Sequence, residues 1–151
     1  MAEAFSVQVQ TDDFDVGVET SLLSFGRMDV GAVASFTGLV RGGNGLIAMT
    51  LEHYPAMTEK ALSAIVTQAR ERWPLFAVRV IHRVGRLLPG ERIVFVGVAS
   101  SHRGSAFEAC EFIMDYLKTR APFWKKEELP GGSRWVDAHD SDDAAAVRWQ
   151  T

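Results

Sequence analysis

A pair of strand-like segments, joined by a short turn and followed at once by a long helical pattern, constrains the fold of this chain most. FAVRVIHRVG alternates valines and His82 on one face with Arg79, Ile81 and Arg83 on the other. LLPGER joins this segment to the apolar run IVFVGVA, and such a turn between two strand patterns predicts a hairpin.

Two helices are predicted around this hairpin. Ser105 followed three residues later by Glu108 matches a capping box, so a helix is expected through AFEACEFIMDYLKTRA until Pro122 stops it. Thr58 is expected to cap a second helix, TEKALSAIVTQARERW, whose apolar residues recur at three- and four-residue spacing and which ends near Trp73.

The other segments are predicted from alternation and turn residues. FSVQVQ is expected to form a strand, and Asp12 or Asp13 to cap a short helix that runs to about Ser24. VGAVASFTGLV and IAMTLEHY, separated by RGGNG, predict a further hairpin. FWKKEELPGGSRW is expected to be irregular or short strand, with a turn at PGG.

These elements predict an α+β fold with mostly antiparallel strand pairs and packed helices. With 151 residues and 47% hydrophobic residues, the chain has enough apolar material for one substantial core. We therefore expect a single domain over 1–151, with an N-terminal strand and helix in 1–30 and a C-terminal tail in 137–151. In that tail, Ser141 could start a short helix, and Arg148 and Trp149 could reach a partner, although a frayed terminus is an equal alternative.

Composition excludes several classes of function. The formal net charge of −3 provides no excess of positive charge for nucleic acid or an anionic membrane. The sequence has neither a basic leader with an apolar run nor a membrane-length apolar stretch, so a soluble, cytoplasmic protein is expected. GxGxxG and GxxxxGK[ST] elements are also absent, which disfavours the common nucleotide-binding folds.

Cysteine and histidine usage disfavours redox and metal chemistry. Cys110 is the one cysteine, so there is no internal disulfide or CxxC pair, and its place on the predicted helix favours an inert, buried thiol. His53, His82 and His139 are not spaced like metal ligands and are assigned structural roles. No metal and no cofactor are expected. The aromatic residues Trp73, Phe123, Trp124 and Trp135 are assigned to the core or to an interface.

Cationic and imidazole side chains gather around the ends of the predicted elements. Arg41 directly follows a strand, and His102 and Arg103 lie between a strand and a helix. The end of that helix is followed by further lysines, and the whole group could line one anion pocket. A lysine crowded by other cations can act as a nucleophile or a base. The cations at this end are Lys118, Arg120, Lys125 and Lys126.

Structural roles are the alternative for each of these groups. Arg120 and Lys126 could be ordinary solvated charges. Lys118 could simply oppose the helix dipole from the last helical turn, and His102 could cap a helix or bridge loops. The residues alone thus predict an anion site without naming its substrate.

Three segments together make the sequence specific: SFTGLVR, TLEHYPAMTEKAL and VIHRVGRLLPGERIVFVGVASSHRGSAFEACEFIMDYLKTRAPFWKKE. With Arg134 and Trp135 after them, they resemble the family of large, catalytic subunits of molybdopterin synthase from about Gly31 to the end of the chain. The resemblance implies an α/β hammerhead-type domain that forms a homodimer within a heterotetramer. It also implies a small ubiquitin-like sulfur-carrier partner with a thiocarboxylated C-terminal glycine. As a sulfurtransferase of molybdenum cofactor biosynthesis, such an enzyme converts cyclic pyranopterin monophosphate into the dithiolene of molybdopterin.

The resemblance also implies roles for individual residues. Lys118 is expected to be the principal catalytic lysine and Lys125 to assist it. Arg41, His102 and Arg103 are expected to hold the phosphate and polar edge of the substrate. The remaining substrate-binding positions that it implies are Leu39, Val40, Lys126 and Glu127, together with the two catalytic lysines.

One departure from the family pattern lies next to Arg41. The loop RGGNGLIA is shorter and richer in glycine than the family's RNxNxG form, and Leu39 replaces its usual lysine. A non-catalytic module that binds the ubiquitin-like partner is therefore the main alternative to an active enzyme. A general phosphometabolite or nucleic-acid binder is disfavoured by the net charge.

Overall fold

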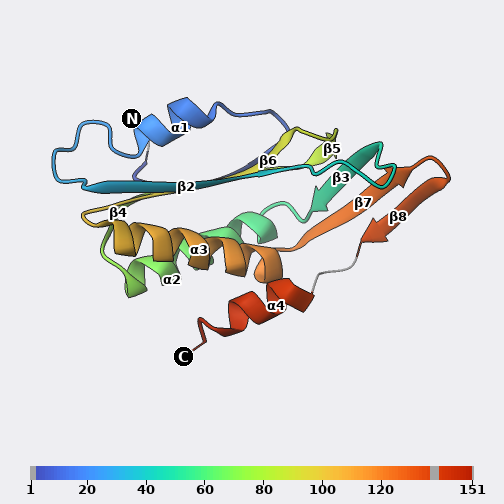
Figure 1. Cartoon of the computed structure of the whole chain (residues 1–151). Coiled ribbons are helices and arrows are strands. Elements are labelled where there is room, and N and C mark those ends of the chain that lie inside the picture. Colours follow the sequence, from blue (N-terminus) through green and yellow to red (C-terminus); the bar gives the residue numbers. More distant parts are fainter. Residues whose placement is uncertain (1–2, 137–139, 151) are drawn as a thin grey trace.

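The computed structural model describes residues 3–136 and 140–150, which form two four-stranded sheets and four helices (Figure 1). Sheet A has the strand order β1-β4-β6-β2, and sheet B has the order β5-β3-β7-β8. Strands β1 and β4 are parallel, and the other neighbouring strands are antiparallel. The strands are β1 (Phe5–Gln10), β2 (Ala32–Leu39), β3 (Ala48–His53), β4 (Leu75–Arg83), β5 (Gly85–Leu87), β6 (Arg92–Ser100), β7 (Phe123–Leu129) and β8 (Gly132–Val136). The helices are α1 (Val16–Leu22), α2 (Met57–Arg72), α3 (Arg103–Arg120) and α4 (Asp140–Val147).

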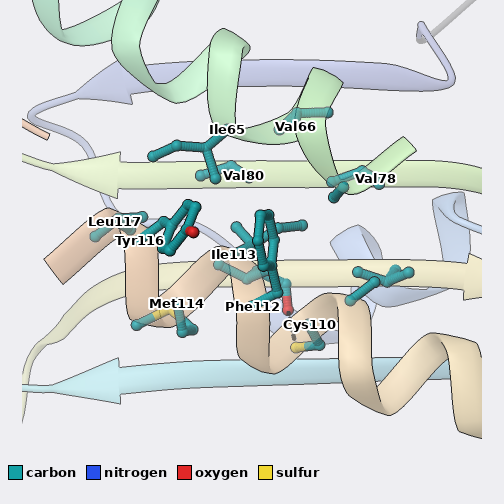
Figure 2. Packing of buried hydrophobic residues seen from close by; sticks show 14 of the residues in the cluster. Ile65, Val66, Val78, Val80, Cys110, Phe112, Ile113, Met114, Tyr116 and Leu117 are labelled. Carbon is teal, nitrogen blue, oxygen red and sulfur yellow. Dashed lines mark hydrogen bonds between the residues drawn. The ribbon is translucent and has the colours of Figure 1, made fainter. Parts of the chain in front are cut away.

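The helices cover the two faces of sheet A unequally. In Figure 1, α1 lies over one face of sheet A, α2 and α3 lie against the other, and α4 lies beside α3. The main core is between sheet A and the α2–α3 layer, where Figure 2 shows Ile65 of α2 and Phe112 of α3 directed toward the valines of β4. Full burial of each such side chain stabilises the fold by about 1.5–3 kcal/mol. The mixed α+β class predicted from sequence is confirmed.

The hairpin of β4 and β6 is confirmed, including its alternation. Val78 and Val80 face the α2–α3 core, whereas Ile81 packs on the other face with Phe14 and Phe95. The connection between the two strands also contains β5, which pairs with β3 and so ties the hairpin to sheet B.

The predicted hairpin of β2 and β3 is wrong. β2 pairs with β6 in sheet A, and β3 pairs with β5 and β7 in sheet B. The glycine-rich loop between them contains Gly43, Asn44 and Gly45, all with positive φ, and these turn the chain from one sheet to the other. The apolar strand β6 needs a neighbour on each edge, and β2 fills the edge that β4 leaves open.

The predicted cap of α1 is also wrong. The carboxylate of Asp15, not Asp12 or Asp13, accepts a hydrogen bond of 3.0 Å from the backbone N–H of Val18. Asp13 instead makes a fork-like pair with Arg92 at 2.6 and 3.0 Å, a long-range contact that the local pattern could not reveal. The pair holds the pKa of Asp13 below its usual value.

The long helices end about where predicted but start earlier. Thr58 lies inside the first turn of α2, where its hydroxyl donates to the carbonyl of Tyr54 at 2.9 Å instead of capping. Ser105 lies in the first turn of α3, whose N-cap is His102, without a hydrogen bond from the side chain. His102 therefore has the capping position that was considered as its alternative role.

The C-terminal segments pack on the chain itself. β7 and β8 form a regular hairpin where irregular or short strand was expected. The helix expected near Ser141 is present as α4, and beyond it Trp149 donates to Asp115 at 2.7 Å and packs edge-on against Trp73 and Phe112. Arg148 pairs with Asp115 at 3.0 Å and with Glu111. His139 lies outside the described residues, and no described helix is long and apolar enough to cross a membrane.

Candidate active site

The site begins where α3 ends and the chain enters sheet B. Lys118 lies in the last turn of α3, which ends at the C-cap Ala121, and is half-buried. Lys125 follows on β7, opposite Leu51 of β3, and is half-buried too. The short connection through Pro122 thus brings the two lysines to the same end of the molecule.

His82 lies within electrostatic range of both lysines. Its ring is only 4% exposed and stacks on Phe123 with centroids 3.8 Å apart and planes 17° apart. Burial, opposed by a hydrogen bond to the carbonyl of Arg83, lowers the pKa of His82 to about 3, and the charges of Lys118 and Lys125 add to this lowering. The imidazole is therefore neutral at physiological pH.

The hydrogen-bond partner of His82 sets which nitrogen carries the proton. Nδ1 lies 2.8 Å from the carbonyl oxygen of Arg83, so this nitrogen donates and Nε2 keeps a lone pair. Sequence analysis gave His82 a structural role and missed that it is near enough to the lysines to feel their charges. The alternation of β4 contained the signal, because it placed His82 on the face that α3 covers.

The alternation of β7 separates two residues that were expected to act together. Neighbouring side chains in a strand point to opposite faces, so Lys126 projects away from the face of Lys125. The Nζ of Lys126 lies 5.5 Å from the ring centroid of Trp135. Glu127 shares the face of Lys125 but accepts a hydrogen bond from Arg134 at 3.1 Å.

The expected anion-binding residues divide between two ends of sheet A. β2 and α3 run in the same direction, and Arg41 follows the end of β2, at the end of the molecule where α3 reaches Lys118 (Figure 1). His102 and Arg103 are exposed at the start of α3. The helical rise of α3 puts Arg103 about 22 Å from Lys118. One chain therefore brings Arg41, Lys118 and Lys125 to one end, and His102 and Arg103 to the other.

Leu39 and Val40 differ in accessibility. Leu39 is 54% exposed at the end of β2, whereas Val40 is 2% exposed and packs with Leu51 and Leu87. The backbone groups of Val40 are also engaged with the loop before β6. Only Leu39 of this pair presents a side chain to the surface.

A groove runs along the outer edge of sheet A. It lies between β2 and α3, has a volume of about 610 Å³, and ends at Lys118. Phe36 of β2 and Phe107 of α3 line it and are 43% and 65% exposed. Because β2 is an edge strand, its outer backbone groups also face this side.

Cys110 lines the groove but is held as an inert thiol. The residue is 7% exposed, and its Sγ lies 3.7 Å from the carbonyl oxygen of Val96 (Figure 2). Burial raises the pKa of Cys110 to about 12, so the nucleophilic thiolate is not populated near neutral pH.

The remaining candidates take surface or core positions. Arg120 stacks its guanidinium 4.0 Å from the ring centroid of Tyr116, and Trp73 packs into the core against Phe112. Trp124 and Trp135 stay exposed on sheet B. Residues 3–136 and 140–150 contain no cluster of three His, Cys, Asp or Glu side chains suited to a metal ion.

Comparison with known proteins identifies close relatives. The family model described as MoaE protein matches residues 9–120, so the likeness starts well before Gly31, where the sequence motifs begin. The molybdopterin synthase catalytic subunit of Escherichia coli is 59% identical over 152 residues, which cover 99% of this chain and 100% of that protein. A MoaE protein structure from Burkholderia ambifaria superposes with a TM-score of 0.84 at 55% identity, covering 97% of this chain and 98% of that one.

A more distant structure shares the fold alone. The complex of subunits 1 and 2 of molybdopterin-converting factor from Helicobacter pylori matches with a TM-score of 0.73 at 17% identity. The match covers 89% of this chain and 91% of that one.

Proposed function

The chain belongs to the MoaE family, and from this premise we propose that it acts as the catalytic subunit of molybdopterin synthase. In this role it transfers sulfur from the thiocarboxylated C-terminus of a small ubiquitin-like subunit to cyclic pyranopterin monophosphate, forming the dithiolene of molybdopterin. The observation that carries the proposal is the 59% identity to such a subunit over almost the whole chain. The enzyme is a sulfurtransferase, and we place its reaction in the cytoplasm.

The geometry around Lys118 supports a role in charge stabilisation. In each transfer the thiocarboxylate sulfur bonds to a substrate carbon as an oxygen substituent leaves that carbon. Water then cleaves the bond between the sulfur and the acyl carbon, which releases the carboxylate of the small subunit and leaves a thiolate on the substrate. Negative charge develops during both steps, and half-buried ammonium groups stabilise such charge more effectively than exposed ones. We assign this stabilisation to Lys118, with assistance from Lys125.

Because His82 is neutral, it adds no further positive charge near Lys118 and Lys125. A protonated imidazole beside two ammonium groups would be costly, and burial prevents it. We therefore assign His82 a positioning role, in which it stacks on Phe123 at the base of β7 and fixes the strand that carries Lys125. This role does not require the imidazole to touch substrate.

A second copy of the chain would complete the site. Arg103 lies about 22 Å from Lys118 along α3, and His102 lies farther still, so neither can hold the same small substrate as Lys118 within one chain. A two-fold axis across the middle of α3 would pair the two helices antiparallel, so the start of one lies beside the end of the other. The exposed Phe36 and Phe107 along the groove offer an apolar contact for such a pair. We propose that Arg41 and Lys118 of one copy work with His102 and Arg103 of the other.

The full assembly is proposed to be a heterotetramer. The two-subunit complex of the Helicobacter pylori protein, which has the same fold, supports a separate small subunit. Two catalytic chains with one small subunit each give two equivalent sites.

Activity should be tested with the separate components of the reaction. The purified protein is mixed with a thiocarboxylated small subunit and cyclic pyranopterin monophosphate, and the dithiolene product is followed by mass spectrometry. Lys118→Ala is compared with Arg120→Ala, a matched control that removes a cation two residues away, stacked on Tyr116. The proposal expects product with wild type and Arg120→Ala but almost none with Lys118→Ala.

A stable complex without product would instead support the binding-module alternative. The short loop after Arg41 would then be the first segment to replace. Equal rates for wild type and Lys118→Ala would remove the central assignment.

A further inference from the structure

A second cavity lies on the face of sheet A that α2 and α3 do not cover. It has a volume of about 420 Å³ and lies between α1, β1 and β4, whereas the groove that ends at Lys118 lies along α3. Its walls are largely apolar, with Leu22 and Leu23 of α1, Phe25 of the following loop and Phe76 of β4. This volume lies within the range of small-molecule pockets, which is about 300–1,000 Å³.

Glu19 places a buried carboxylate in this apolar cavity. The residue is 9% exposed and lines the cavity from α1. Its Oε1 accepts a hydrogen bond of 3.3 Å from Nε of Arg79. Its Oε2 is buried and has no hydrogen-bond partner among the described residues. A buried acceptor without a donor is costly, and most such groups in native proteins are satisfied by a partner, a water or a ligand.

The nearby arginines are already engaged and do not supply the missing donor. Arg79 donates through its terminal nitrogens to Ser6 at 3.0 Å and to Gln8 at 3.2 Å. Arg27 makes a two-point pair with Asp29 at 2.8 and 2.9 Å, and its guanidinium lies 4.2 Å from the ring centroid of Phe76. The carboxylate of Glu19 therefore lacks one hydrogen-bond donor, and a donor in the cavity supplies it when the soft terminal torsion of the side chain turns Oε2 toward the cavity.

We propose that this cavity is a binding site for a small organic cation with an apolar body and an N–H donor, such as an amidinium or a primary ammonium. The apolar walls hold the body, and the N–H group donates to Oε2 of Glu19. An anion of the same size meets the carboxylate unfavourably and finds both arginines occupied. The site lies away from Lys118 and does not depend on sulfur transfer.

Benzamidine is a suitable probe because its planar amidinium presents N–H donors on a small apolar ring. The full-length ¹⁵N-labelled protein is titrated with benzamidine, benzyl alcohol and benzoate, and backbone amide shifts are followed by NMR. For a ligand of this size we expect a Kd of about 1 mM for benzamidine. The saturable shifts should centre on α1 and β4, with weaker binding of benzyl alcohol and none of benzoate.

Two variants and a matched control locate the site. Glu19→Gln removes the charge and should weaken benzamidine binding roughly tenfold or more. Leu22→Arg is the second variant, since Leu22 is 48% exposed and lies one helical turn after Glu19. From there a new guanidinium can pair with the Glu19 carboxylate and so take the place of the ligand's amidinium. Val18→Arg introduces the same charge on the same helix, at an exposed position outside the cavity lining, and should bind benzamidine like wild type.

Three results would overturn the proposal. The first is the absence of saturable shifts with benzamidine, and the second is equal binding of benzoate. The third is unchanged benzamidine binding by both Glu19→Gln and Leu22→Arg in folded protein. Shifts at the same amides that depend on protein concentration alone would show that a second copy covers this face, and would also overturn it.

Discussion

Replacing His82 by asparagine should make the folded protein less sensitive to acid. Burial lowers the pKa of His82 to about 3, whereas an unfolded chain has the ordinary value of 6.5. Below pH 6.5 the unfolded chain therefore binds a proton that the folded chain does not, so the free energy of unfolding falls as the pH falls. Asparagine does not titrate, and its amide N–H can still donate to the carbonyl of Arg83.

The size of this effect follows from the two pKa values. The loss of stability due to His82 is about 1 kcal/mol near pH 5.5 and roughly 3 kcal/mol near pH 4.5. His82→Asn loses the stack on Phe123 and should be less stable near neutral pH. Its stability should then decline less steeply than that of wild type, and the difference between the two proteins should shrink or reverse in acid.

Urea unfolding at several pH values measures this slope. The free energies are compared between about pH 7.5 and pH 4.5. His102→Asn is the matched control, because it makes the same substitution at an exposed histidine. Parallel curves for wild type and His82→Asn would refute the reasoning, because they would mean that His82 has the same proton affinity in both states.

Three further predictions concern the site and its surroundings. Lys125→Ala should lower the rate of sulfur transfer by about 100-fold, whereas Lys126→Ala, on the opposite face of β7, should change it only slightly; product formation under single-turnover conditions measures both. Cys110 should not react with iodoacetamide near pH 8 in the folded protein, because burial raises its pKa to about 12, but should react in urea, as mass spectrometry can show. Trp149→Ala should lower the free energy of unfolding by about 2 kcal/mol, because the indole packs on Trp73 and Phe112 and donates to Asp115. Urea unfolding measures this, and a wild-type free energy for the variant would contradict the packing of Trp149 on α3.

Local patterns predicted the elements of this fold better than their partners. The alternation of β4 and the helical spacing of α3 were strong signals, because each buries one face against the other. The pairing of β2 with β6 was missed because hairpin prediction favours neighbours in sequence, whereas the backbone groups on the open edge of the buried strand β6 had to be paired. The cap at Asp15 was missed, and Ser105 was preferred to His102, for a related reason, since several polar residues near each helix start satisfy the same local rule.

The candidate site was predicted only in part. Clusters of charge near the ends of elements suggested that Lys118 and Lys125 share one pocket, and the short connection from α3 to β7 brings both lysines to the same end of the molecule. Sequence alone placed His102 before the helix and Lys118 in its last turn, but it could not show that Arg41 lies at the same end as Lys118, because that requires the pairing of β2 with β6. Nor could it identify Glu19, whose burial depends on β1 and β4 beneath α1. The assigned roles of the site residues, like the single domain, stay predictions.

The measurement that tests the central claim most directly is complementation between two inactive variants. Lys118→Ala and Arg103→Ala are purified separately, mixed, unfolded and refolded together, and then assayed with the thiocarboxylated small subunit and substrate. Random pairing of the two variants makes half of the dimers mixed. If each site takes Lys118 from one copy and Arg103 from the other, each mixed dimer has one intact site of two, so the mixture should recover about a quarter of the wild-type activity. If the mixture instead remains as inactive as the separate variants, although dimers form, then the two copies do not share a site and the account is wrong.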